Sequence, residues 1–185
     1  MRNRLLALAV APLLVLAACG NDKSSDTTMP GGSTTTSSMP VLFSLADSLA
    51  AQPKYSTLVA ALHESGLDTV FSGTASYPQY TIFAPTNDAF DKLPDGVLEK
   101  LLKPENKSVL IKILQFHVLA ERILEKDISA GFISTLEGED LTVKHKPQVY
   151  VNDAKVSSTD LLAVNGVIHE INKVLVPSSV NIDTL

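Results

Sequence analysis

The sequence predicts an α+β fold in which helices come first and β-strands last. Up to Phe116, apolar residues recur every three or four positions, which is the period of a helix packed on one face. Beyond Phe116 they alternate with polar residues, as in a strand with one buried face. Helices grouped before strands indicate α+β rather than an alternating α/β fold. With 185 residues and 45% apolar side chains, the chain can form one domain with a proper core and a short extension.

Four helices are expected in the first part of the chain. The first covers residues 41–49, and the second begins after Pro53 and stops at Gly66, because glycine favours the left-handed conformation of a helix C-cap. Two more are expected over Pro94–Leu102 and Glu105–Phe116. The apolar positions that indicate these helices are Val41, Leu42, Leu45, Leu49, Leu58, Val59, Leu62, Val109, Leu110, Ile113 and Leu114.

One early strand and a series of late strands complete the expected elements. The strands are predicted over Tyr80–Ala84, Ile133–Leu136, Leu141–Lys144, Val149–Val151, Ala154–Val156 and Val167–Val176. Gly138, Asn152-Asp153 and Asn165-Gly166 mark turns between the late strands. Because such short turns join strands that run in opposite directions, the late strands are expected to be antiparallel.

Charge and composition exclude several classes of function. Fifteen Lys and Arg residues against 20 Asp and Glu residues give a net charge of −5, so the chain lacks the basic surface that nucleic acid requires. One cysteine cannot form an internal disulfide, and four scattered histidines show no spacing of metal ligands. No glycine-rich phosphate loop and no nucleophile elbow are present. We therefore expect no enzyme activity, no metal and no cofactor.

The first 18 residues have the pattern of a secretory signal peptide. Arg2 and Arg4 precede an apolar run over Leu5–Leu16, which is too short to span a bilayer comfortably. The junction Leu16-Ala17-Ala18-Cys19 resembles the lipobox of bacterial lipoproteins, and this resemblance implies cleavage before Cys19 and its lipidation. The alternative is an ordinary signal peptide cut near Ala18, which leaves a free thiol.

Residues 19–40 are expected to form a flexible tether between the lipidated Cys19 and the domain. Ser, Thr, Gly and Pro dominate this segment, so it cannot bury enough surface to offset its chain entropy. Sorting rules known for Gram-negative lipoproteins, applied by resemblance to Gly20, favour the outer membrane over the inner one. The expected location is therefore the cell envelope, with the domain facing the periplasm or the exterior.

Three segments carry a recognisable pattern: Thr81-Ile82-Phe83-Ala84-Pro85-Thr86-Asn87-Asp88-Ala89-Phe90, Leu114-Gln115-Phe116-His117-Val118-Leu119, and Asn165 to Pro177. In this order and at these separations they resemble the fasciclin-like domain. The resemblance covers residues 41–178 and leaves 179–185 as a tail. It implies a compact β-wedge flanked by several α-helices, in a family whose members are secreted or surface-bound and often work in cell adhesion or matrix binding.

The first segment contains two candidate binding residues, Asn87 and Asp88. Pro85 ends the strand, Thr86 is placed to cap the next helix, and Asp88 in the first turn complements the helix dipole. Capping accounts for every residue type here and is the favoured interpretation. The alternative is that Asn87 and Asp88 form part of a surface epitope.

The second segment contains Phe116 and His117, where the family motif is a Tyr-His pair associated with adhesion and folding integrity. Phe116 lacks the tyrosine hydroxyl and Ala120-Glu121 replace the family's Pro-Gly, so the chain departs from the family pattern here. Phe116 and His117 are nevertheless kept as candidate binding residues implied by the resemblance. Beside an apolar helix end, a buried and hydrogen-bonded neutral histidine is favoured over a ligand-binding one.

The third segment is predicted to be structural. Asn165-Gly166 is a strong signal for a hairpin turn, and His169 lies between Val167 and Ile171 on one face of the following strand. His169 is therefore interpreted as a core histidine with its hydrogen bonds satisfied.

The resulting hypothesis is a lipid-anchored, non-catalytic binding or adhesion module that contacts a surface protein or polysaccharide. One alternative is a carrier or sensor of a small apolar ligand, because some fasciclin-like proteins bind carotenoids. A further alternative is a structural protein of the cell envelope. The oligomeric state is left open by the sequence.

Overall fold

The computed structural model describes residues 43–73, 78–145 and 147–182. The predicted signal peptide over 1–18, the lipidation site Cys19 and the predicted tether to residue 40 lie outside the described residues. The described residues belong to the predicted domain and to the first part of its C-terminal tail.

Helices contain most of the described residues up to Phe116. They are α1 (Leu45–Ala50), η1 (Pro53–Tyr55), α2 (Ser56–Ser65), α3 (Asp68–Phe71), α4 (Asn87–Phe90), α5 (Val97–Leu101), η2 (Pro104–Asn106) and α6 (Lys107–Phe116), with η3 (Glu125–Asp127) further on. Ser44 caps the start of helix α1, because its hydroxyl accepts a hydrogen bond from the Asp47 backbone N–H. Helix α2 stops at Gly66 in the left-handed conformation, as the sequence predicts.

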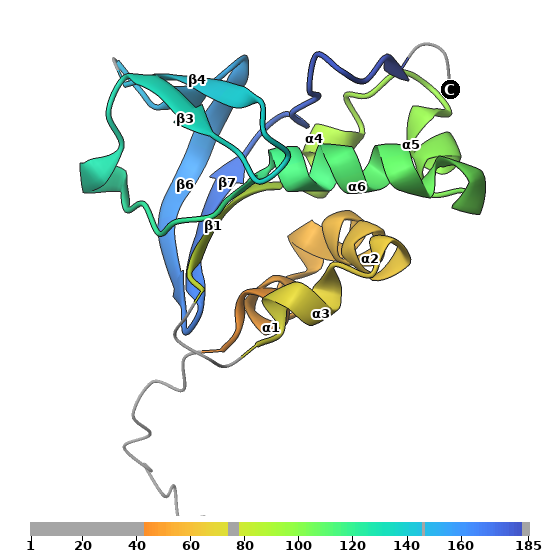
Figure 1. Ribbon diagram of the computed structural model, residues 1–185, viewed down its shortest axis with the longest axis horizontal. Coiled ribbons are helices and arrows are strands. Elements are labelled where there is room, and N and C mark those ends of the chain that lie inside the picture. Colours follow the sequence, from red (N-terminus) through yellow and green to blue (C-terminus); the bar gives the residue numbers. More distant parts are fainter. Residues whose placement is uncertain (1–42, 74–77, 146, 183–185) are drawn as a thin grey trace, which may run out of the picture. The chain divides into compact units, whose positions relative to one another are not determined.

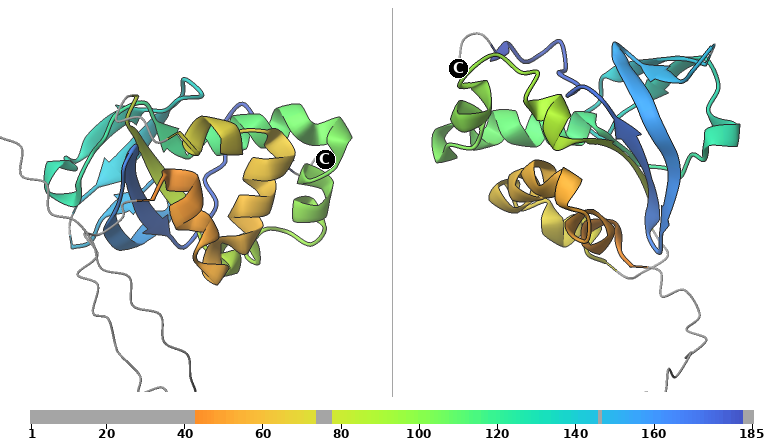
Figure 2. Two further views of the ribbon diagram at one scale, coloured as in Figure 1. Left: turned by 90° about the horizontal axis from the view of Figure 1, so that it is seen from below. Right: turned by 180° about the vertical axis from the view of Figure 1, so that it is seen from behind.

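Within the described residues, the strands form one seven-stranded sheet in the order β2-β1-β7-β6-β5-β4-β3. Their bounds are β1 (Tyr80–Pro85), β2 (Val118–Leu119), β3 (Gly131–Ser134), β4 (Asp140–Lys144), β5 (Tyr150–Val151), β6 (Ala154–Ala163) and β7 (Gly166–Ile171). The α+β prediction is confirmed. Helices α1, α2, α3 and α6 lie on one side of β1 and β7, while β3 and β4 lie on the other (Figure 1). Figure 2 shows the same separation from below and from behind.

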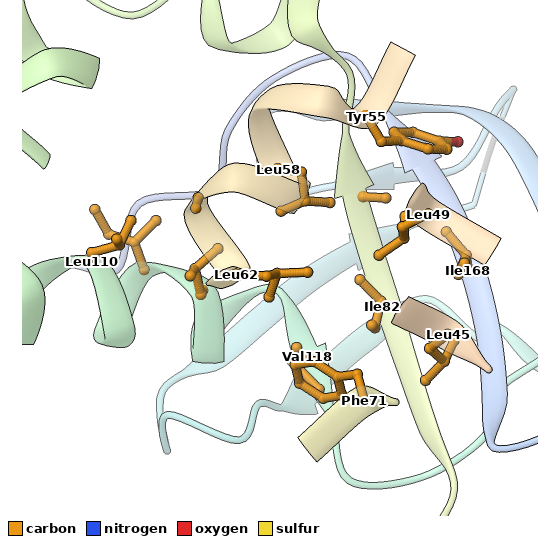
Figure 3. Close-up of a cluster of buried hydrophobic side chains, with 14 of the residues drawn as sticks. Leu45, Leu49, Tyr55, Leu58, Leu62, Phe71, Ile82, Leu110, Val118 and Ile168 are labelled. Atoms are coloured by element: carbon orange, nitrogen blue, oxygen red, sulfur yellow. The ribbon is translucent and has the colours of Figure 1, made fainter. Parts of the chain in front are cut away.

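Two hydrophobic clusters share strand β1. Ile82 and Ala84 belong to the cluster on the helical side, whereas Phe83 belongs to the cluster enclosed by the strands. This alternation follows from the period of a strand, and it buries β1 on both faces. In Figure 3, side chains from α1, α2 and α3 surround Ile82 of β1 and Ile168 of β7. The position of β1 is therefore determined by packing on both sides.

The sheet differs from the expected antiparallel arrangement in one pairing. Strands β1 and β7 are parallel, and their register runs from Tyr80 opposite Gly166 to Pro85 opposite Ile171. Strand β7 also ends at Ile171 rather than at Val176, because the backbone N–H of Leu175 donates to the ring of His117 and not to a neighbouring strand. Strand β6 extends to Ala163, seven residues beyond its predicted end, and pairs with β7 through two register shifts.

Candidate binding surface

The parallel pairing of β1 and β7 creates a shared end of the sheet. Because the strands run in the same direction, the residues that follow Pro85 lie beside those that follow Ile171. Thr86 donates its backbone N–H to the carbonyl of Ile171 over 3.4 Å, which joins the two strand ends. Helix α4 begins immediately afterwards with Asn87. Two of the recognised sequence segments therefore meet at this edge.

A surface hollow of about 340 Å³ lies at this end of the sheet, and we call it the polar hollow. It is lined by Lys54, Thr86, Asn87, Asp88, Lys92, Ser157, Glu170 and Asn172. The lining comes from η1, the β1–α4 junction, the turn after α4, β6 and the end of β7. Positively charged, negatively charged and uncharged polar side chains surround it, so the polar hollow suits hydrogen bonding to a polar ligand.

Asn87 connects α4 to the start of α2. Its side-chain amide donates to the carbonyl of Pro53 and to the hydroxyl of Ser56, both over 3.0 Å. Its side-chain oxygen accepts the backbone N–H of Thr57 over 3.1 Å, as an N-cap oxygen does, although it comes from another part of the chain. Thr86 occupies the N-cap position of α4, but its side chain makes no capping hydrogen bond, contrary to expectation.

Charged side chains at the polar hollow are partly paired. Lys54 forms an ion pair with Glu170, which also accepts a hydrogen bond from the hydroxyl of Tyr55 over 3.0 Å. Burial, followed by the nearby Glu170 charge, raises the pKa of Tyr55, so this hydroxyl remains a hydrogen-bond donor. Lys92 donates to the carbonyl of Asn172 over 2.8 Å. Asp88 is exposed beside these groups, and of the two carboxylates that line the polar hollow it is more accessible to a partner than Glu170.

Phe116 and His117 lie in the interior and not at the polar hollow. Each is only 2% exposed. The Nδ1 atom of His117 lies 2.7 Å from the carbonyl of Ile113, and Nε2 accepts the backbone N–H of Leu175 over 2.9 Å. Burial lowers the pKa of His117 to about 4, so the ring is neutral at physiological pH. In this conformation neither side chain offers a surface to a macromolecule.

Asn165 and Gly166 join the hairpin to the helices. The side-chain oxygen of Asn165 accepts the backbone N–H of Leu45 over 2.8 Å, and its amide donates to the carbonyl of Phe71 over 2.9 Å. Gly166 lies so close to β1 that a Cβ atom there would come within 2.1 Å of the Tyr80 carbonyl oxygen. Asn165 therefore connects the β6–β7 hairpin to α1 and α3, and Gly166 allows the hairpin to lie close against β1.

His169 is fully buried in β7 and hydrogen-bonded on both ring nitrogens. Nε2 lies 2.8 Å from the carbonyl of Ile123, and Nδ1 accepts the backbone N–H of Asp160 over 3.3 Å. Burial lowers its pKa. These contacts attach the loop that precedes η3 to the sheet.

The family model for the fasciclin domain matches residues 53–177. The chain belongs to the fasciclin family. Its fasciclin domain is 46% identical to Protein sll1483 of Synechocystis sp. over 129 residues, which cover 69% of this chain and 70% of that protein. It is 33% identical to Immunogenic protein MPB70 of Mycobacterium bovis, over 93% of this chain and 89% of the relative.

Longer animal proteins contain similar domains. Transforming growth factor-beta-induced protein ig-h3 of Sus scrofa is 39% identical over 75% of this chain, which spans only 20% of that protein. The domain pair of the insect cell adhesion molecule Fasciclin I has the same fold, with a TM-score of 0.65 at 17% identity over 74% of this chain and 52% of that chain. Fasciclin domains occur in extracellular and cell-surface proteins. None of the helices within the described ranges has the length and apolar character needed to cross a bilayer.

The fasciclin fold separates the four candidate binding residues. Asn87 and Asp88 lie at the polar hollow, whereas Phe116 and His117 are buried in the domain. Sequence reasoning did not identify Lys54, Lys92 or Asn172 as part of a site. No local pattern could have done so, because Lys54 and Lys92 lie 118 and 80 residues before Asn172 and share a hollow with it only once β1 and β7 are paired.

Proposed function

We propose that this fasciclin domain is a non-catalytic binding or adhesion module that contacts a surface protein or polysaccharide through the polar hollow. The observation that carries the proposal is the junction of two family segments around one accessible hollow, with Asp88 exposed on it. Family membership supports a binding role, because fasciclin domains generally serve adhesion and not catalysis. We further propose that the domain is held at the cell envelope by lipid on Cys19.

The composition of the polar hollow supports a hydrogen-bonding partner. Two lysines, two carboxylates and two asparagine amides surround it. Such groups recognise hydroxyl, amide and carboxylate groups, which polysaccharides and polar protein surfaces both present. Because Asn87, Lys92 and Glu170 are already held by neighbouring groups, the lining is organised before a partner arrives.

Binding by the mature chain and by two charge-reversal variants tests this proposal. Asp88→Lys reverses the exposed carboxylate at the polar hollow, whereas Asp95→Lys makes the same change at an exposed position outside the hollow lining. With beads coated by each protein, we expect Asp88→Lys to weaken attachment to envelope polysaccharide or to cells by about tenfold, roughly 1.4 kcal/mol. Equal attachment by both variants, or no attachment by the parent chain above a control protein, would contradict the proposal.

The alternative of a small apolar ligand has less support from the geometry. A hollow of about 220 Å³ between α1, α2 and α3 is lined partly by aliphatic side chains. Its lining residues are Ala46, Asp47, Ala50, Val59, Leu62, His63, Asp68 and Ser72. This volume is below the roughly 300–1,000 Å³ typical of small-molecule sites. A pigment or lipid released on denaturing the protein from its own cells would nevertheless favour this alternative over adhesion.

A further inference from the structure

Three segments of the domain meet around Asn165, at the end of the β6–β7 hairpin. The chain enters the described domain at Phe43, whose carbonyl accepts the backbone N–H of Val164 over 3.0 Å. Asn165 then joins the start of α1 to the end of α3, through Leu45 and Phe71. These contacts place the first residues of the domain, the end of α3 and the hairpin turn at one location.

Exposed apolar side chains gather on these segments. Of the six large apolar side chains that are exposed among the described residues, four lie here and form what we call the tip patch. They are Phe43 (56% exposed), Val70 (44%), Leu161 (37%) and Leu162 (44%). Leu161 and Leu162 are consecutive in a strand and point to opposite faces, so the apolar surface extends around the hairpin. Several exposed apolar side chains on adjoining segments mark a contact surface more often than a single exposed leucine does.

We propose that the tip patch docks on the lipid bilayer to which the chain is anchored. This inference rests on the proposed lipid anchor at Cys19. Phe43 follows Cys19 by 24 residues, and a tether of that length, with the flexibility expected from the sequence, would span roughly 27 Å. An anchor so near the tip patch holds it at an effective concentration in the millimolar range, so a weak apolar contact with the bilayer is enough.

Docking at the tip patch also sets the orientation of the domain. Strands β1 and β7 start beside the tip patch, at Tyr80 and Gly166, and end beside the polar hollow, at Pro85 and Ile171. Six paired residues, with five rises of about 3.3 Å between them, separate the two ends by about 17 Å. In Figure 1, α4 and the turn between β6 and β7 lie at opposite ends of these strands. A domain that rests on the bilayer through the tip patch therefore presents the polar hollow away from the membrane.

The contact is apolar and not electrostatic. Once the predicted signal peptide with Arg2 and Arg4 is removed, 13 Lys and Arg residues remain against 20 Asp and Glu residues, so an anionic bilayer repels the chain as a whole. Docking driven by burial of the tip patch persists when salt is added, because screening weakens the repulsion and leaves the apolar contact unchanged.

Nitroxide depth measurements on the full lipidated chain test this inference. Cys19 is the sole cysteine, so once it is acylated an introduced cysteine is the only free thiol. Val70→Cys places a label in the tip patch, and Phe132→Cys places one on β3, where the parent residue is 77% exposed. The proteins are reconstituted in vesicles of phosphatidylethanolamine and phosphatidylglycerol. We expect collisions with oxygen to dominate at Val70→Cys and collisions with a water-soluble nickel chelate to dominate at Phe132→Cys.

Two substitution sets separate docking from folding. Phe43→Ser with Leu162→Ser should abolish the bilayer signal at Val70→Cys, whereas the matched change Leu136→Ser, at another exposed apolar residue, should retain it. Melting temperatures of both sets are measured so that loss of signal is assigned only to folded protein.

If the chain does not float with the vesicles, the anchor itself fails, and the inference fails with it. A chain that floats but gives the same collision profile at both labels overturns the docking inference alone. Shielding of Val70→Cys from both reagents, in cells only, would assign the tip patch to a protein partner and overturn the bilayer.

Discussion

At the scale of single residues, His117 holds three parts of the domain in one arrangement. Its ring lies against the Ile113 carbonyl of α6 and accepts the N–H of Leu175, while its own carbonyl accepts the N–H of Phe83 in β1. Nδ1 must carry the proton, because Nε2 acts as an acceptor. The sequence places this histidine correctly beside an apolar helix end. It could not predict the contact with Leu175, which lies 58 residues further along the chain.

Replacing His117 tests its structural role. His117→Ala removes the acceptor for the Leu175 N–H inside the domain, and we expect the free energy of unfolding to fall by about 1–3 kcal/mol. His63→Ala, at an exposed position of α2, should change it by less than about 0.5 kcal/mol. Urea denaturation followed by circular dichroism measures both. Unchanged stability with lost binding to cells would instead make His117 a contact residue.

At the scale of elements, the close approach of β1 and β7 depends on a residue without a side chain. Gly166 begins β7 opposite Tyr80, and a Cβ atom there would overlap the Tyr80 carbonyl and crowd the side chain of Leu45 at 2.9 Å. The carbonyl belongs to the backbone of a strand buried on both faces, so it cannot move aside easily. The glycine therefore serves strand packing as well as the hairpin turn.

Gly166→Ala should accordingly be strongly destabilising. We expect a loss of about 3 kcal/mol in the free energy of unfolding, at the upper end of overpacking effects, because the two strands must separate. Gly73→Ala is the matched control, since a Cβ atom there meets nothing within 4 Å. Thermal melts of both variants provide the comparison. Equal melting temperatures would mean that the backbone at Gly166 relaxes freely.

Elements that rest on local patterns were predictable, and those that rest on distant contacts were not. The stop of α2 at Gly66 and the core strand Tyr80–Ala84 follow from residue types that act locally. The parallel partner of β1, the end of β7 at Ile171 and the length of β6 depend on pairings between remote segments. Helix α3 (Asp68–Phe71) is a single turn, too short for a periodic signal. The polar hollow was missed for the same reason as the parallel pairing, since it exists only once β1 and β7 are paired.

At the scale of the whole molecule, acid should weaken the fold. The pKa of His117 falls from 6.5 to about 4 on folding, and burial also lowers the pKa of His169. Between pH 6.5 and pH 4, His117 binds a proton in the unfolded chain but not in the folded one. The stability that it contributes is therefore complete above pH 6.5 and falls as the pH drops toward 4. The loss from His117 amounts to about 3 kcal/mol. Hydrogen bonds from Ser178 and Ser179 lower the pKa of Glu139 to about 2, so their contribution is lost at still lower pH.

Denaturation midpoints measured across this range check the expected slope. We expect the urea midpoint of the parent chain to decrease steadily from pH 6.5 to pH 4, whereas His117→Gln, which has no titratable ring, should show a much shallower decrease. A midpoint that stays constant over this range in the parent chain would show that neither histidine is held neutral by the fold.

The pairing of β1 with β7 also bears on when the domain can fold during synthesis. Strand β1 is an inner strand, next to the edge strand β2, yet its parallel partner starts 86 residues later in the sequence, at Gly166. Until β7 has been made, β1 has only the two-residue strand β2 beside it, and its apolar residues have no second neighbour to cover them. Chains dominated by such remote pairings fold slowly, through intermediates that expose apolar surface and tend to aggregate. The sheet therefore cannot be completed before β7 has been synthesised, and until then the nascent chain lacks the folded core that would block its passage through a narrow pore.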